Sequence, residues 1–258
     1  MKMKNSPILL SILFTVLALV FPAIAGAIIT IKNISSSSSI FLIQFISTAA
    51  GVLVILWIMK KSKFSFRDFG FKKFKVEAWM AVIVVIELVP FLNGITDNDG
   101  FSAQYIFILL LFVIAVGFCE ELIFRGLIFK YLSAKGLKVA ILGSSILFGI
   151  GHLANLASGQ DFLMTLLQII FAFLFGLVCA EIVAKAKSII LPIVWHATHD
   201  FFAFLTDKSE PNVLAVSIYV FQCILLIGLA IYFWKALFTK KDKAGAVIIN
   251  NEKPESYV

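Results

Sequence analysis

Long apolar runs separated by short polar stretches dominate the chain. At a rise of 1.5 Å per residue, each run is long enough to cross about 30 Å of hydrocarbon. The pattern predicts an all-α, polytopic membrane protein with about eight transmembrane helices. These cover residues 7–30, 39–59, 78–94, 104–131, 138–157, 162–184, 188–205 and 213–238.

The composition agrees with this pattern. Hydrophobic residues make up 61% of the 258 residues and charged residues 14%, and the mean hydropathy is +1.02. These values exclude an ordinary soluble domain. We expect one transmembrane helical domain over 1–239, with its chemistry concentrated in a motif core at 104–205. A mobile cytoplasmic tail is predicted over 240–258.

The positive charges alternate between the two sides of the predicted bundle. The net charge of +7 could suggest nucleic acid, but the basic residues are not gathered in one cluster, so we expect no nucleic-acid partner. Only Lys32 and Lys208 fall on the less basic side, and the outer loop at 95–100 is acidic. The positive-inside rule then predicts a multi-pass cell-membrane protein with both termini in the cytoplasm.

The first apolar run has two interpretations. Lys2 and Lys4 precede it, and Ala23-Ile24-Ala25 resembles a signal-peptidase site, so cleavage after Ala25 is one alternative. The run continues through Ile31, which is longer than most signal sequences. We therefore favour a retained first span.

Besides Lys130 at its end, the fourth run carries three charged residues: Glu120, Glu121 and Arg125. A charge in mid-bilayer costs at least about 2.5–3.5 kcal/mol, so such a group indicates a functional site. Glu121 and Arg125 have i,i+4 spacing and can pair on one helix face. Glu120 is rotated by about 100° and left available for chemistry. The alternative is that both glutamates serve only to neutralise Arg125.

All three histidines lie in two other apolar runs. Phe148 and His152 share one helix face, as do His196 and Asp200, while His199 is adjacent and can point elsewhere. From the cytoplasmic helix ends, the depths are roughly 16 Å for Glu120, 21 Å for His152, and 12 and 18 Å for His196 and Asp200. The motifs therefore lie at a similar depth, nearer the cytoplasm. A lone histidine on an apolar helix is more often only a buried structural residue.

Two further acids lie within apolar runs. Glu87, in the third run, lies at a depth of roughly 13 Å and can join the polar network or pair with a neighbour. Glu181 has Lys185 at i+4, so we expect an interfacial ion pair between them.

Taken in order, E-E-x-x-x-R, F-x-x-x-H and H-x-x-x-D on separate helices resemble the CaaX protease and bacteriocin-processing family, also called Abi or CPBP. The motifs cover about 119–200. The resemblance implies an intramembrane endopeptidase, with Glu121, Arg125 and Phe148 supporting the site and Asp200 standing where eukaryotic members carry Asn. It also implies membrane-associated, lipidated or small peptide substrates, or membrane proteins. In bacteria the family is associated with bacteriocin immunity and peptide maturation.

Peptide hydrolysis by such a site requires an activated water. We expect Glu120 to act as general base, His152 to orient the water, and His196 with Asp200 to stabilise the oxyanion. If ionised, Asp200 more plausibly orients His196. This mechanism needs no cofactor. The alternative is a zinc site with Glu120, His152 and His196 as ligands, although H-E-x-x-H is absent.

A non-enzymatic function is the competing class. The same polar cluster could line a transport path or stabilise a membrane scaffold. The absence of recognisable inverted repeats argues against a transporter. The short loops and the Lys-, Ile- and Phe-rich composition suggest a bacterial plasma membrane. Substrate identity and oligomeric state do not follow from the sequence.

Overall fold

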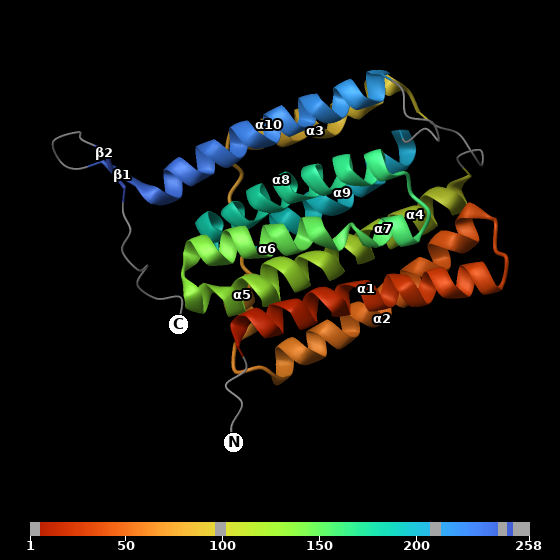
Figure 1. Cartoon of the computed structure of the whole chain (residues 1–258), viewed down its shortest axis with the longest axis horizontal. Helices are drawn as coiled ribbons and strands as arrows, with labels where there is room; N and C mark the ends of the chain where they lie inside the picture. The colour runs from red at the N-terminus through yellow and green to blue at the C-terminus, as the bar shows by residue number, and fades with distance from the viewer. Residues whose placement is uncertain (1–5, 96–101, 207–212, 242–246, 250–258) are drawn as a thin grey trace.

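The computed structural model describes residues 6–95, 102–206, 213–241 and 247–249. The long helices lie side by side and alternate in direction along one bundle (Figure 1). The helical elements are α1 (Pro7–Ile31), α2 (Ser37–Lys61), η1 (Phe66–Phe69), α3 (Met80–Leu88), η2 (Val89–Asn93), α4 (Ala103–Glu121), η3 (Leu122–Ile128), α5 (Phe129–Leu132), η4 (Ser133–Lys135), α6 (Leu137–Gly151), α7 (Ala154–Ala157), α8 (Phe162–Ala186), α9 (Ile190–Thr206) and α10 (Val213–Phe238).

The all-helical membrane fold is confirmed. Each of the eight predicted runs is helical, and six helices are long and apolar enough to span a membrane. The run at 78–94 is instead a shorter apolar helix, Met80–Asn93, which becomes 3₁₀-helical where Pro90 cannot donate a backbone hydrogen bond. Helix α9 has only 17 residues. The number of crossings and their orientation remain predictions.

Part of the C-terminal segment is ordered. Strands β1 (Thr239–Lys241) and β2 (Val247–Ile249) pair in antiparallel fashion. The remainder of the predicted tail lies outside the described residues. So do Lys2 and Lys4, most of the acidic loop at 95–100, and Lys208.

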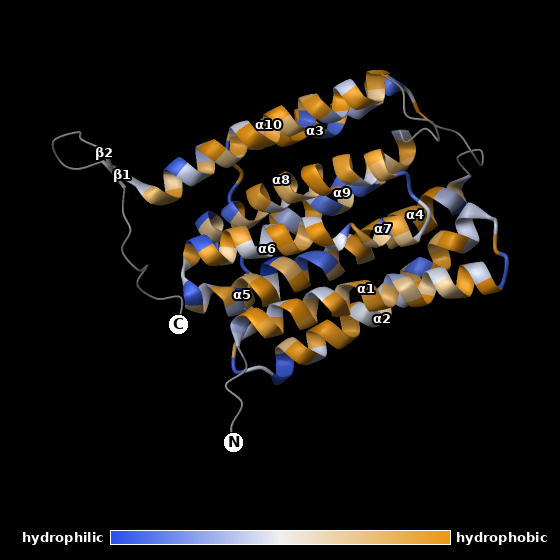
Figure 2. Cartoon of the chain, viewed as in Figure 1, coloured by the Kyte–Doolittle hydropathy of each residue, from blue (hydrophilic) through white to orange (hydrophobic). Residues whose placement is uncertain are grey.

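The distribution of polarity is that of a membrane protein. Figure 2 shows apolar residues along the helices and polar residues at their ends. Large apolar side chains face outwards, such as Leu53 and Phe107, which are 69% and 62% exposed. Glu121 and Arg125, by contrast, are 0% and 1% exposed. A lipid environment explains why apolar groups cover the outside while charges lie within the bundle.

Glycines allow the site-bearing helices to approach closely. A Cβ atom on Gly117 of α4 would lie 2.9 Å from the backbone nitrogen of Ala197 in α9. A Cβ atom on Gly149 of α6 would lie 3.1 Å from the carbonyl oxygen of Ile169 in α8. The helices therefore meet closely at Gly149, whereas nothing would lie within 4 Å of a Cβ on Gly151. Close packing of this kind holds α4, α6, α8 and α9 around the buried polar groups.

Candidate active site

The charged motif of the fourth run lies at the junction of α4 and η3. The seven-residue segment η3 is π-helical, a departure from α-helix that often marks functional sites. The predicted ion pair forms there, with Arg125 Nη1 2.9 Å from Glu121 Oε1. The guanidinium carbon of Arg125 also lies 4.3 Å from the centre of the Phe148 ring. These contacts confirm the pairing of Glu121 with Arg125 and identify Phe148 as a packing partner of Arg125.

Helix α9 brings His196 to this ion pair. His196 Nδ1 lies 3.0 Å from Glu121 Oε1. Because the arginine-paired carboxylate is an acceptor, Nδ1 must carry the proton of this hydrogen bond. The other nitrogen, Nε2, lies 3.9 Å from Glu120 Oε2 and 3.7 Å from Asp200 Oδ2.

Two carboxylates thus lie at opposite nitrogens of His196. Glu121 contacts Nδ1, and Asp200, which was expected to orient His196 if ionised, faces Nε2. Glu121 therefore has two partners, Arg125 and His196. The sequence indicated only the first, because His196 is distant in the chain.

The second motif packs beside the first. His152 is the C-cap of α6, and its Nδ1 lies 3.0 Å from the carbonyl oxygen of Phe148. A carbonyl can only accept, so Nδ1 donates and Nε2 of the neutral ring is left as an acceptor. The Phe148 ring lies between the two histidines, with centroid distances of 5.2 Å to His152 and 5.7 Å to His196.

A second carboxylate–imidazole pair lies next to the first. Glu87 of α3 accepts a hydrogen bond from Trp195 Nε1 at 2.7 Å, and its Oε2 lies 3.1 Å from His199 Nδ1. The expectation that Glu87 pairs with a neighbour is confirmed. His199 was not expected to belong to the site. Its i,i+4 spacing from Trp195, on the helix face that meets Glu87, is the signal that could have identified it.

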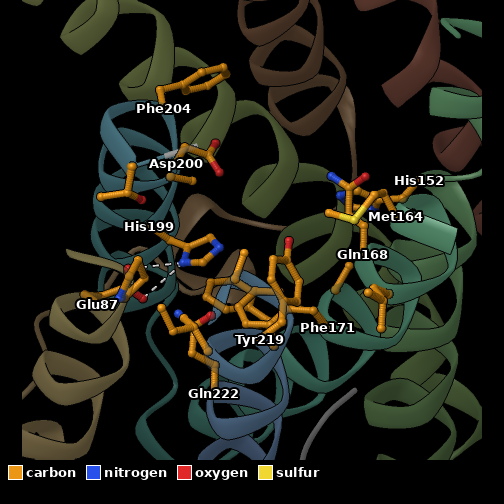
Figure 3. A pocket seen from close by; sticks show the side chains of 18 of the residues that line it. Glu87, His152, Met164, Gln168, Phe171, His199, Asp200, Phe204, Tyr219 and Gln222 are labelled. Atoms are coloured by element: carbon orange, nitrogen blue, oxygen red, sulfur yellow. Dashed lines mark hydrogen bonds and ion pairs between the residues drawn. The ribbon is translucent and has the colours of Figure 1, made fainter. Parts of the chain in front are cut away.

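A cavity of about 320 Å³ opens beside these groups. Figure 3 shows the Glu87–His199 contact at its wall, with Phe171 and Tyr219 alongside. His152, His196 and Asp200 also line it. Glu120 does not line this cavity, but its Oε2 lies 3.9 Å from Nε2 of His196, which does. The Glu120 side chain remains 28% exposed.

The alternative zinc site requires three converging ligands. Within the described ranges, no group of three or more His, Cys, Asp or Glu side chains is placed to hold a metal ion. As placed, the residues do not fit a zinc ion.

The expected ion pair between Glu181 and Lys185 is wrong. Lys185 Nζ reaches Glu77 instead, at 2.8 Å. Glu181 is fully buried, and neither carboxylate oxygen has a hydrogen-bond partner among the described residues. The long lysine side chain extends outwards to an exposed partner, while the glutamate on the preceding turn points into the bundle.

Comparison with known families covers the same region. A family described as type II CAAX prenyl endopeptidase Rce1-like matches residues 102–202. The chain is similar to this family over that segment. The Rce1-like segment runs from the start of α4 into α9 and contains all the motif residues, but it leaves out Glu87 and α10. No curated protein matches the chain.

Proposed function

We propose that the protein is an intramembrane endopeptidase that hydrolyses peptide bonds with a water activated by Glu120 and His152. One observation carries the proposal: His196 Nε2 lies between the carboxylates of Glu120 and Asp200 at the wall of a cavity, while Glu121 fixes Nδ1. The Rce1-like match supports the reaction class. No metal is assigned a step in this mechanism.

Water activation rests on Glu120 and His152. Glu120 is the partly exposed carboxylate of the pair, and it has no partner comparable to Arg125. It can therefore accept a proton from water as the oxygen attacks the peptide carbonyl. His152 presents Nε2 as an acceptor because Nδ1 donates to Phe148, so it can hold the second hydrogen of that water.

Oxyanion stabilisation is assigned to His196 and Asp200. As the imidazolium, His196 donates from Nδ1 to Glu121 and from Nε2 to the developing oxyanion. Asp200, one helical turn further on, can add a second hydrogen bond only when protonated. The Glu121–Arg125 ion pair fixes the ring orientation of His196, which is a positioning role.

The cavity favours a peptide substrate presented from the bilayer. Its volume, about 320 Å³, is at the lower end for ligand pockets. Aromatic residues such as Phe171 and Tyr219 alternate with amide side chains such as Gln168 and Gln222. This lining suits an extended segment with apolar side chains and a hydrogen-bonding backbone. We assign membrane-associated or lipidated peptides as the substrate class, in the cell membrane and with cleavage nearer the cytoplasmic side.

The direct test is peptide cleavage by purified full-length protein in lipid nanodiscs. Glu120→Gln and His152→Ala should each abolish turnover while leaving the thermal unfolding temperature within a few degrees of wild type. Glu77→Gln removes an exposed carboxylate far from the site and should retain activity. Wild-type turnover by Glu120→Gln would refute the mechanism. If neither the wild type nor any variant cleaves prenylated or unmodified peptides, a scaffold or transporter function would be favoured.

Asp200 separates two versions of the oxyanion step. Asn at position 200 keeps a donor without ionising, whereas Ala removes both functions. If Asp200 donates to the oxyanion, Asp200→Asn should retain activity and Asp200→Ala should lose at least about tenfold to a hundredfold. An Asn variant as inactive as the Ala variant would contradict the donor role.

Metal dependence has its own test. Extraction with a strong chelator should leave the cleavage rate unchanged under the water-activation mechanism. Loss of activity that zinc restores, with stoichiometric zinc in the active protein, would replace it with the zinc mechanism.

A further inference from the structure

A second cavity, of about 310 Å³, lies at the end of the bundle where α2, α5 and α8 finish. It shares no lining residue with the cavity beside His196, and its lining residue Arg125 contacts Glu121 of the active site. We call it the basic pocket. Its charged lining residues are Arg67, Asp68, Lys72, Arg125, Lys130 and Lys187.

The walls of the basic pocket are held by specific contacts. Gly70 adopts φ +92°, and a Cβ there would lie 2.9 Å from Ile189 Cγ2. The Ile189 N–H donates to the Gly70 carbonyl at 2.9 Å, and the Ser188 hydroxyl donates to the Lys72 carbonyl. The loop before α3 is therefore fastened to the loop between α8 and α9. This fastening brings Lys72 and Lys187, from distant parts of the chain, into one pocket.

The single acid of the lining is already engaged locally. Asp68 Oδ2 accepts hydrogen bonds from the Ser65 N–H at 2.8 Å and the Ser65 hydroxyl at 2.6 Å. These bonds lower the pKa of Asp68 below its ordinary value, with smaller contributions from Lys130 and Lys72. One capped carboxylate therefore faces five cationic side chains.

Two observations describe the cationic groups at this pocket. Partial burial, followed by the charge of Lys72, lowers the pKa of Lys187 from 10.5 to about 8. Independently, Arg125 is 1% exposed, and its Nε and Nη2 atoms have no hydrogen-bond partner among the described residues. Only Nη1 is paired, with Glu121. A buried guanidinium with unpaired donors at a cationic pocket indicates a missing anion.

We propose that the basic pocket binds the phosphate group of an anionic phospholipid headgroup. Its walls come from the ends of apolar spans, which is where a bilayer would place headgroups. A phosphate diester offers acceptor oxygens that suit Arg and Lys donors. Bound there, it would lie next to Arg125, whose other nitrogen holds Glu121 and through it His196. The proposal does not depend on proteolysis.

The test uses full-length protein in a neutral detergent, titrated with short-chain phosphatidylglycerol, short-chain phosphatidylcholine or inorganic phosphate. Binding is measured by native mass spectrometry and by the thermal shift that a native-state ligand produces. Phosphatidylglycerol should bind and phosphatidylcholine should not. Inorganic phosphate binding as tightly as phosphatidylglycerol would assign the site to a free phosphate and overturn the lipid assignment.

Matched variants locate the site. Lys72→Gln with Lys187→Asn removes two pocket charges, and Asn tolerates the left-handed backbone at 187, where φ is +56°. Lys60→Gln with Lys61→Gln removes the same charge from the exposed end of α2. The pocket variant should weaken phosphatidylglycerol binding by about tenfold or more, and the control should not. Arg67→Gln serves if the pocket variant fails to fold. Equal binding by pocket and control variants would overturn the proposal.

Discussion

Gly117 sets the distance between the helix that carries the glutamates and the helix that carries His196. A Cβ at position 117 would lie 2.9 Å from Ala197 N, 3.1 Å from Ile193 O and 3.3 Å from Ala197 Cα. Ordinary contact begins near 3.4 Å, and all three atoms are backbone. None of these backbone atoms can rotate away, so Gly117→Ala requires α9 to move by about 0.5 Å.

That displacement acts directly on the site. His196 immediately precedes Ala197, and its 3.0 Å contact with Glu121 would lengthen to the limit of hydrogen bonding. A misplacement of about 1 Å costs on the order of a hundredfold in rate, so about tenfold is expected here. The stability cost of overpacking, about 1–3 kcal/mol, is partly offset by the better helix propensity of Ala.

The assay is kcat/KM for peptide cleavage in nanodiscs, with thermal unfolding measured in parallel. Gly228→Ala on α10 is the matched control, because nothing lies within 4 Å of a Cβ there. Its kcat/KM should equal that of wild type. If Gly117→Ala also cleaves at the wild-type rate, the separation of α4 and α9 does not govern the geometry of His196, and the reasoning fails.

Three further changes test the charged groups by thermal unfolding. Arg125→Ala leaves Glu121 buried without its cation and should cost about 3–5 kcal/mol, so unfolding at an unchanged temperature would contradict the buried pairing. Glu181→Met replaces a buried carboxylate that has no hydrogen-bond partner among the described residues and should stabilise by about 1–3 kcal/mol; a destabilised variant would show that the carboxylate has a partner. Because the pKa of Lys187 is lowered to about 8 from 10.5, the unfolded state binds more protons between these values, and this group makes stability rise with pH across that window. Lys187→Asn should flatten that rise, and an unchanged pH profile would refute the assignment.

The sequence predicted what depends on run length and local spacing. The eight helical ranges follow from the length of each apolar run, and the Glu121–Arg125 pair follows from i,i+4 spacing. Contacts between distant segments depend on how each helix is rotated about its own axis, and the hydropathy pattern does not determine this rotation. Glu87 and Trp195 are 108 positions apart, so neither their hydrogen bond nor the role of His199 was visible. Lys185 illustrates the same limit, because local spacing offered Glu181 and the fold provided Glu77.

The π-helical segment η3 makes the fourth span two helices in series. A π-turn accommodates one residue more than an α-turn, and one residue corresponds to about 100° of rotation about the axis. The carboxylates of α4 stand before this joint, and Lys130 of α5, at the basic pocket, follows it. Each half therefore keeps its own register against its neighbours. Deleting one residue of η3 other than Arg125 would preserve every side chain of both sites while rotating α4 relative to α5. The active site and the basic pocket could then not both stay aligned.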